Sequence, residues 1–281
     1  MIYTSSSCIE NCRDIESVLN AYEKLGIERV ELGSAHRYHP NIKSLVKKYN
    51  FKYIIHNNFP PPKEDLILNL ASPNDGIWQR SISQVKTAID FAKLIKSKIV
   101  SIHAGFSEDP DINFRFSLNP QDNDSAMERF IKALKMLEEY SSKQHILLAV
   151  ENNVVAGYNI RDGYTPLLMG TSPECEYVFN KVRSRYFGML LDIAHLNVSA
   201  FNLKFDRDDF IERTRKFVKE LHIHENNGVS DQHLGLSNGS WFEKTVRSFK
   251  DQKELYFTLE SSSLKESEII KNLKTLKKWL V

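Results

Sequence analysis

Cysteine is scarce in this sequence, and no run of apolar residues is long enough to cross a membrane. The chain has 281 residues and three cysteines, Cys8, Cys12 and Cys175, with no C-x-x-C motif and no secretion signal. This usage predicts structural cysteines in a reduced, cytoplasmic compartment. A membrane-spanning helix needs about 18 or more consecutive apolar residues, so we expect no membrane partner.

An excess of charge of one sign is also lacking. The 38 Lys and Arg residues nearly balance the 36 Asp and Glu residues, which leaves a formal net charge of +2. This balance gives no sign of a strong field for nucleic acid or anionic lipid. The composition is that of an ordinary globular protein, and no linker or shift in composition divides it. We therefore expect a single domain over residues 1–281.

Short apolar runs recur along the chain, and each ends in polar residues. They predict eight strands, at residues 2–7, 29–34, 52–58, 98–105, 146–153, 188–195, 220–227 and 255–262. Amphipathic segments predict helices at 14–25, 41–49, 79–95, 125–140, 173–182, 207–218, 241–249 and 265–280, with Ser125 and Ser172 as N-caps. Eight strand–helix pairs favour a closed (β/α)8 TIM barrel over an open doubly wound sheet. The longer loops, at 59–77, 106–124 and 154–171, leave the carboxyl ends of strands.

Residue types that bind metals close most of the predicted strands. At strand ends these residues are His56, His103, Glu151, Asp192, His195, His222 and Glu260, and the loop after the seventh strand adds Asp231 and His233. The carboxyl ends of barrel strands meet at one mouth, so we expect five histidines and four carboxylates to converge there. Each residue alone has a structural explanation. As a set, the acids repel one another, and no Lys or Arg in these motifs neutralises them, which predicts bound divalent cations.

The segment ELHIH, at residues 220–224, begins the densest part of this set. Strand alternation places His222 and His224 on one face and Leu221 and Ile223 on the other. A mixture of imidazole and carboxylate suits transition metals better than calcium, and we expect zinc or manganese. Nine candidates exceed the needs of one ion. Either two or three ions bind, or some of the nine residues support the ligands or contact substrate.

Eight short motifs follow one another in a familiar order. They are HNNF (56–59), LNLASPN (68–74), HAG (103–105), VENN (150–153), LDIAH (191–195), LHIHENN (221–227), DQH (231–233) and LES (259–261). Through them the chain resembles, over essentially its whole length, the xylose isomerase-like barrel superfamily. That superfamily contains divalent-metal sugar isomerases and epimerases together with the endonuclease IV group.

The resemblance implies two sets of ligands. The residues that look like the four-ligand metal site of the epimerases are Glu151, Asp192, His222 and Glu260. The residues that look like the further ligands of the three-zinc cluster of endonuclease IV are His56, His103, His195, Asp231 and His233. Two segments depart from the nuclease pattern. A proline-rich stretch at 60–63 separates LNLASPN from His56, and SNG stands at 237–239 in place of a G-E-G-like turn.

Three functions are compatible with these residues. In the first, a divalent metal binds an open-chain sugar or sugar phosphate, Glu151 and Glu260 move the proton, and His195 holds a substrate oxygen. In the second, two or three zinc ions hydrolyse a phosphodiester, and nucleic acid is a partner only under this alternative. In the third, the barrel binds metal without catalysis. We expect the first, with His36 and His39 solvated and His145 structural.

Overall fold

Eight parallel strands close into a barrel. The computed structural model describes residues 1–119 and 121–281, so one residue of the loop expected at 106–124 lies outside the described residues. The strands are β1 (Ile2–Ser5), β2 (Arg29–Leu32), β3 (Lys52–His56), β4 (Ile99–His103), β5 (Leu147–Glu151), β6 (Phe187–Asp192), β7 (Val218–Ile223) and β8 (Tyr256–Leu259). Each strand pairs with the next, and β8 pairs with β1. The predicted TIM barrel is confirmed, and the open sheet is excluded.

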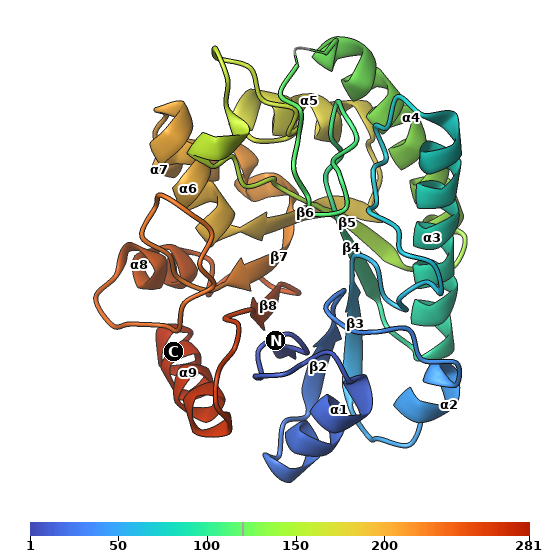
Figure 1. Ribbon diagram of the computed structural model, residues 1–281. Coiled ribbons are helices and arrows are strands. Elements are labelled where there is room, and N and C mark those ends of the chain that lie inside the picture. The colour runs from blue at the N-terminus through green and yellow to red at the C-terminus, as the bar shows by residue number, and fades with distance from the viewer. Residues whose placement is uncertain (120) are drawn as a thin grey trace.

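Helices surround the strands on the outside of the barrel (Figure 1). They are α1 (Ile15–Lys24), α2 (Ile42–Val46), α3 (Asp75–Leu94), α4 (Asn123–Ser142), α5 (Ser172–Lys181), α6 (Ile193–Leu203), α7 (Arg207–Thr214), α8 (Trp241–Ser248) and α9 (Glu266–Trp279), with short 3-10 turns η1 (Gly157–Asn159) and η2 (Arg215–Phe217). None of these described helices combines the length and the apolar character that crossing a bilayer requires.

Helix α6 was not predicted, and the strand expected at 188–195 is wrong at its end. Strand β6 stops at Asp192, whose carboxylate accepts hydrogen bonds from the backbone N–H groups of Ala194 and His195, each at 2.7 Å. This is an N-cap, which turns the chain into a helix directly after the strand. His195 therefore lies in the first turn of α6 and not on β6.

The starts of α3, α4 and α5 also differ from the prediction. Helix α3 begins at Asp75, four residues before the start expected at residue 79 and inside the loop expected at 59–77. Helix α4 begins at Asn123 and is capped by Asp122, two residues before the start expected at residue 125. Helix α5 is capped by Thr171, which forms a capping box with Glu174, so the expected cap Ser172 is already inside the helix. Asp caps helices as readily as Ser, and Thr caps them somewhat less readily, so the sequence pattern alone did not choose between neighbouring candidates.

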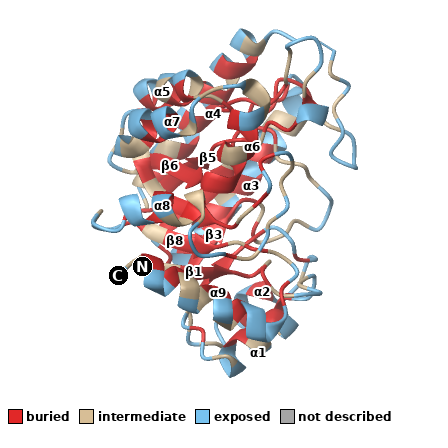
Figure 2. Cartoon of the chain, turned by 90° about the vertical axis from the view of Figure 1, so that its left-hand side faces the viewer, coloured by how far each residue is buried: buried red, intermediate tan, exposed pale blue. Residues whose placement is uncertain are grey.

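Strand alternation separates an apolar outer face from a mixed interior. On β7, Leu221 and Ile223 pack with the helices in the main core, while Glu220 and His222 point into the barrel. The floor of the barrel is apolar and contains Tyr3, Ile54, Ile99, Ala149 and Leu190. Figure 2 shows buried residues along the strands and exposed ones on the outer helices and loops. The interior thus becomes polar towards the carboxyl ends of the strands.

Candidate metal centre

All nine residues singled out in the sequence meet at the carboxyl-terminal mouth of the barrel. Strands β3, β4, β5, β6 and β7 supply His56, His103, Glu151, Asp192 and His222, helix α6 supplies His195, and the loops after β7 and β8 supply Asp231, His233 and Glu260. Together with Glu31 and His224, their side chains form four groups, within each of which the possible ligand atoms lie within 4.8 Å of one another. One of the four consists of Glu31, His56 and His222. The structure therefore brings together the complete predicted set.

The central group consists of Glu151, Asp192, His222 and Glu260. The Nδ1 atom of His222 lies 2.9 Å from a Glu260 oxygen and 3.7 Å from a Glu151 oxygen. It also lies 4.0 Å from a carboxylate oxygen of Asp192. One imidazole nitrogen thus faces three carboxylates from three different segments, which is the donor set of a transition-metal site.

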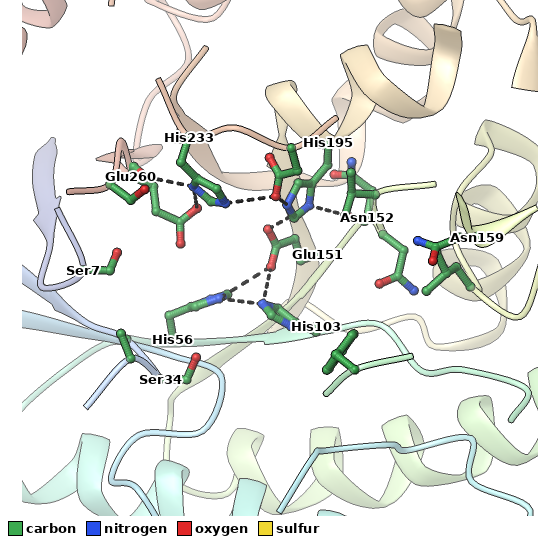
Figure 3. A pocket seen from close by; sticks show the side chains of 18 of the residues that line it. Ser7, Ser34, His56, His103, Glu151, Asn152, Asn159, His195, His233 and Glu260 are labelled. Carbon is green, nitrogen blue, oxygen red and sulfur yellow. Dashed lines mark hydrogen bonds and ion pairs between the residues drawn. The ribbon is translucent and has the colours of Figure 1, made fainter. Parts of the chain in front are cut away.

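The second group shares Glu151 and adds His56 and His103. Figure 3 shows Glu151 between this histidine pair and His195. The Nε2 atoms of His56 and His103 lie 3.0 Å apart, and each is within 3.6 Å of Oε2 of Glu151. The other oxygen, Oε1, lies 3.7 Å from Nδ1 of His222, a member of the central group. Glu151 therefore directs its two oxygens towards different groups, as a carboxylate that bridges two cations does.

The third group contains His195, His224, Asp231 and His233. His195 and His233 each donate Nδ1–H to a backbone carbonyl, of Asn152 and Glu260 respectively, at 3.0 Å. The Nε2 atoms face Asp231 at 3.3 and 2.9 Å. Because a neutral imidazole carries one N–H, these bonds leave both Nε2 lone pairs free for a cation.

Two residues of the mouth were not among the predicted ligands, namely Glu31 and His224. His224 lies 3.0 Å from Asp192 and stacks on His233 with a centroid distance of 3.9 Å. The shared face of His222 and His224 was the sequence signal for it. Glu31 lies on β2 and contacts His222 from below at 2.8 Å. Its signal was a lone acid between the apolar residues of a short strand.

Burial and mutual charge set the ionisation of the group. Burial raises the pKa of Glu151 well above its usual range, although the charge of His195 opposes this. Burial lowers the pKa of His103 to about 4. Burial disfavours the ionised form of Asp192. The positive charges of neighbouring histidines, chiefly His195, have the larger effect and lower the pKa of Asp192 to about 2. Burial lowers the pKa of His233, but the hydrogen bond to the Asp231 carboxylate and the charges of the neighbouring carboxylates together raise it by more, to about 9. Without a cation the mouth retains protons that metal binding would release.

An independent observation indicates that these residues fit a bound metal. Among the described residues, several buried polar atoms at the mouth have no hydrogen-bond partner: Nδ1 of His56, His222 and His224, Oε2 of Glu151 and Oδ1 of Asp231. A buried polar atom without a partner costs about 1–3 kcal/mol. All five atoms belong to residues of these groups, and bound divalent cations would supply partners for buried atoms of this kind.

A cavity of about 810 Å³ opens above these groups. Its lining includes the hydroxyl and amide side chains of Ser5, Ser7, Ser34, Ser262, Tyr158, Asn113, Asn152, Asn153 and Asn159. Phe106, Phe114 and Phe116 form one wall, and Arg115 is the single Lys or Arg among the described lining residues. This volume is that of a small-molecule site, and hydroxyl and amide groups suit a polyhydroxylated ligand.

Three further histidines lie outside the metal groups. His36 was expected in solvent, but it is buried and bonds to Ser6 and Cys12. His39, also expected in solvent, is only partly exposed and accepts a hydrogen bond from the backbone N–H of Asn41. His145 is exposed and contacts the Tyr186 hydroxyl beside the amino ends of the strands.

The chain matches the family model described as xylose isomerase-like TIM barrel over residues 19–279. It is 22% identical over 220 residues to a probable endonuclease 4 of Halothermothrix orenii. The aligned region covers 73% of this chain and 69% of that protein.

Solved structures resemble it along its whole length. A D-tagatose 3-epimerase-like protein superposes with a TM-score of 0.75 at 19% identity and covers 99% of this chain and 96% of its own. D-psicose 3-epimerase of Clostridium cellulolyticum H10 with D-tagatose superposes with a TM-score of 0.65 at 13% identity and covers 99% and 95%. At these identities the likeness shows the fold.

Proposed function

Because this chain belongs to the xylose isomerase-like TIM-barrel family, we propose that it is a divalent-metal-dependent isomerase or epimerase. Its substrate would be a sugar or a sugar phosphate. The observation that carries the proposal is the central group, in which two glutamates, Glu151 and Glu260, share one candidate cation position with Asp192 and His222. The epimerases that resemble this chain in fold support the same class of reaction.

The two glutamates give the site its acid and base. Glu151 comes from β5 and Glu260 follows β8, so they approach the candidate cation position from different strands. One carboxylate would remove the proton next to the substrate carbonyl, and the other would return a proton, on the opposite face for epimerisation. A bound divalent cation supplies the charge stabilisation that the developing enediolate needs.

The remaining residues of the mouth would bind and orient the substrate. His195 lines the cavity next to Glu151, and its Nδ1–H is fixed on the Asn152 carbonyl. Its Nε2 can therefore hold a substrate oxygen or a second cation. Serine and asparagine side chains in the cavity offer donors and acceptors for sugar hydroxyls. The phenylalanine wall would give the substrate an apolar surface on one side of the cavity.

Exchange of substrate hydrogen with solvent tests this function. The metal-loaded chain is incubated with ketoses, such as D-tagatose and D-fructose, and with ketose phosphates in deuterated water. We expect deuterium at the carbon next to the carbonyl and formation of the isomer or epimer. Glu151→Gln and Glu260→Gln should lose turnover by about 10²-fold or more, while Glu139→Gln, an exposed residue of α4, should retain it. Near-normal exchange in both active-site variants would contradict the proposal.

A second function is favoured by one specific observation. Glu151 directs one oxygen to His103 in the second group and the other to His222 in the central group, and a third group with His195, His224, Asp231 and His233 lies beside them. Three adjacent cations would suit hydrolysis of a phosphodiester, because together they can generate hydroxide and stabilise both oxygens of the displacement. The relative named as a probable endonuclease 4 is consistent with this alternative. Zinc-dependent nicking of DNA that contains an abasic site would support it, and its absence with three zinc ions bound would oppose it.

A further inference from the structure

We propose that Glu31 is a positioning residue that fixes His222 for metal binding. This inference rests on the proposed metal-dependent function, but it concerns a carboxylate that is not among the nine predicted ligands, although it lies close enough to His56 and His222 to form a candidate group with them. Glu31 lies on β2, and its side chain and that of His222 on β7 are both fully buried. The two residues are 191 positions apart in sequence, so only closure of the barrel brings them together.

The contact assigns the two nitrogens of His222 to different tasks. Nε2 lies 2.8 Å from Oε2 of Glu31, so this nitrogen carries the hydrogen and donates it to the carboxylate. Nδ1 lies on the other side of the ring and faces the oxygens of Glu151, Asp192 and Glu260. A neutral imidazole has one N–H, so a hydrogen fixed on Nε2 leaves the Nδ1 lone pair for the cation. A carboxylate partner also makes the ligand more basic and holds the ring plane.

The surroundings explain why Glu31 has this task and a neighbouring acid does not. Glu220 is also fully buried inside the barrel, but its nearest approach to His222 is 4.0 Å, beyond hydrogen-bond distance. Its oxygens instead accept hydrogen bonds from the hydroxyls of Ser101 and Thr258. The barrel interior therefore contains two adjacent buried acids, of which one supports the metal ligand and the other is held by hydroxyl groups.

A comparison of Glu31→Gln with Glu220→Gln tests the inference. The affinity of each purified full-length chain for Zn²⁺ and Mn²⁺ is measured by competition with a chelating dye, after thermal melts show that each variant is folded. We expect Glu31→Gln to bind the metal about 10–100-fold more weakly than the wild-type chain, and Glu220→Gln to bind it unchanged. Equal affinities for Glu31→Gln and the wild-type chain, or equal losses in both variants, would overturn the proposal.

A second measurement does not depend on folding of a variant. In the wild-type chain loaded with Zn²⁺ and labelled with ¹⁵N-histidine, nuclear magnetic resonance shows which nitrogen of each imidazole binds the metal. We expect His222 to bind through Nδ1 and to retain a hydrogen-bonded Nε2–H. Binding through Nε2 would overturn the role of Glu31 even if the enzyme is active. A wild-type chain that takes up no metal would contradict the proposed function itself, which separates the two failures.

Discussion

His36 shows how a single buried side chain can make the fold sensitive to acid. Its Nδ1 contacts the Cys12 carbonyl at 2.6 Å and its Nε2 contacts the Ser6 hydroxyl at 2.7 Å. A carbonyl only accepts, so Nδ1 donates, and Nε2 accepts from the hydroxyl. The neutral ring is thus satisfied on both sides. Burial lowers its pKa from 6.5 to about 4, so the protonated ring favours the unfolded chain.

This shift predicts a loss of stability in acid. The folded-state pKa lies below the unfolded value, so the contribution of His36 is complete above pH 6.5 and is lost as the pH falls from 6.5 to about 4. The full effect is about 3 kcal/mol. We expect thermal melts of His36→Gln to depend less on pH over this range than those of the wild-type chain, whereas His145→Gln should match it. A wild-type pH dependence that His36→Gln leaves intact would contradict the assignment.

The sequence predicted the candidate metal ligands better than the residues that hold such side chains in place. The nine candidate ligands are of metal-binding types and stand where strands or their loops end, which a pattern can reveal. Glu31 and the partners of His36 were not predicted, because their contacts are made across the barrel by residues far apart in the chain. His36 was expected in solvent for the same reason.

The loop segments that follow β3 and β4 pack closely against each other at Gly105. Asn69 bridges the two segments, since its side chain accepts a hydrogen bond from the backbone of Phe106 and donates one back. A Cβ atom at Gly105 would lie 2.8 Å from Cβ and 3.0 Å from the backbone nitrogen of Ala71. Neither atom can move without displacing the segment, so a side chain here would push the two loops apart.

We therefore expect Gly105→Ala to destabilise the protein by about 1–3 kcal/mol, as overpacking usually does. Gly33→Ala is the matched control, because it follows β2 at the same end of the barrel and its added Cβ would have 3.6 Å to the nearest atom. Urea denaturation of both variants measures the difference. Equal stability of Gly105→Ala and Gly33→Ala would show that the loops are not packed as described.

The element that sequence reasoning missed is α6, and the reason is physical. The residues after β6 are apolar and continue the pattern of the buried strand, so periodicity gave no boundary. Asp192 ends the strand by capping the helix with Oδ1, while Oδ2 faces His224 and the central metal group. A residue expected only as a ligand thus also starts a helix, and this second role positions His195.

For the whole molecule, the alternation of strands and helices was sufficient to predict the closed barrel, because eight such pairs have few other arrangements. The same regularity brings the strand ends together, so the location of the site followed from the fold. The choice between one cation and three did not follow, since Glu151 belongs to two groups and its carboxylate serves either arrangement. The metal content of the chain separates the two arrangements.

The central claim is that divalent cations hold the acids and histidines of the mouth together. The most direct test is anomalous diffraction from crystals of the chain loaded with Mn²⁺ or Zn²⁺, with elemental analysis of the same sample. The account predicts an ion bound by Glu151, Asp192, His222 and Glu260, with one ion per chain for the isomerase and three for the phosphodiesterase. A loaded crystal with no anomalous peak among these four side chains would contradict it.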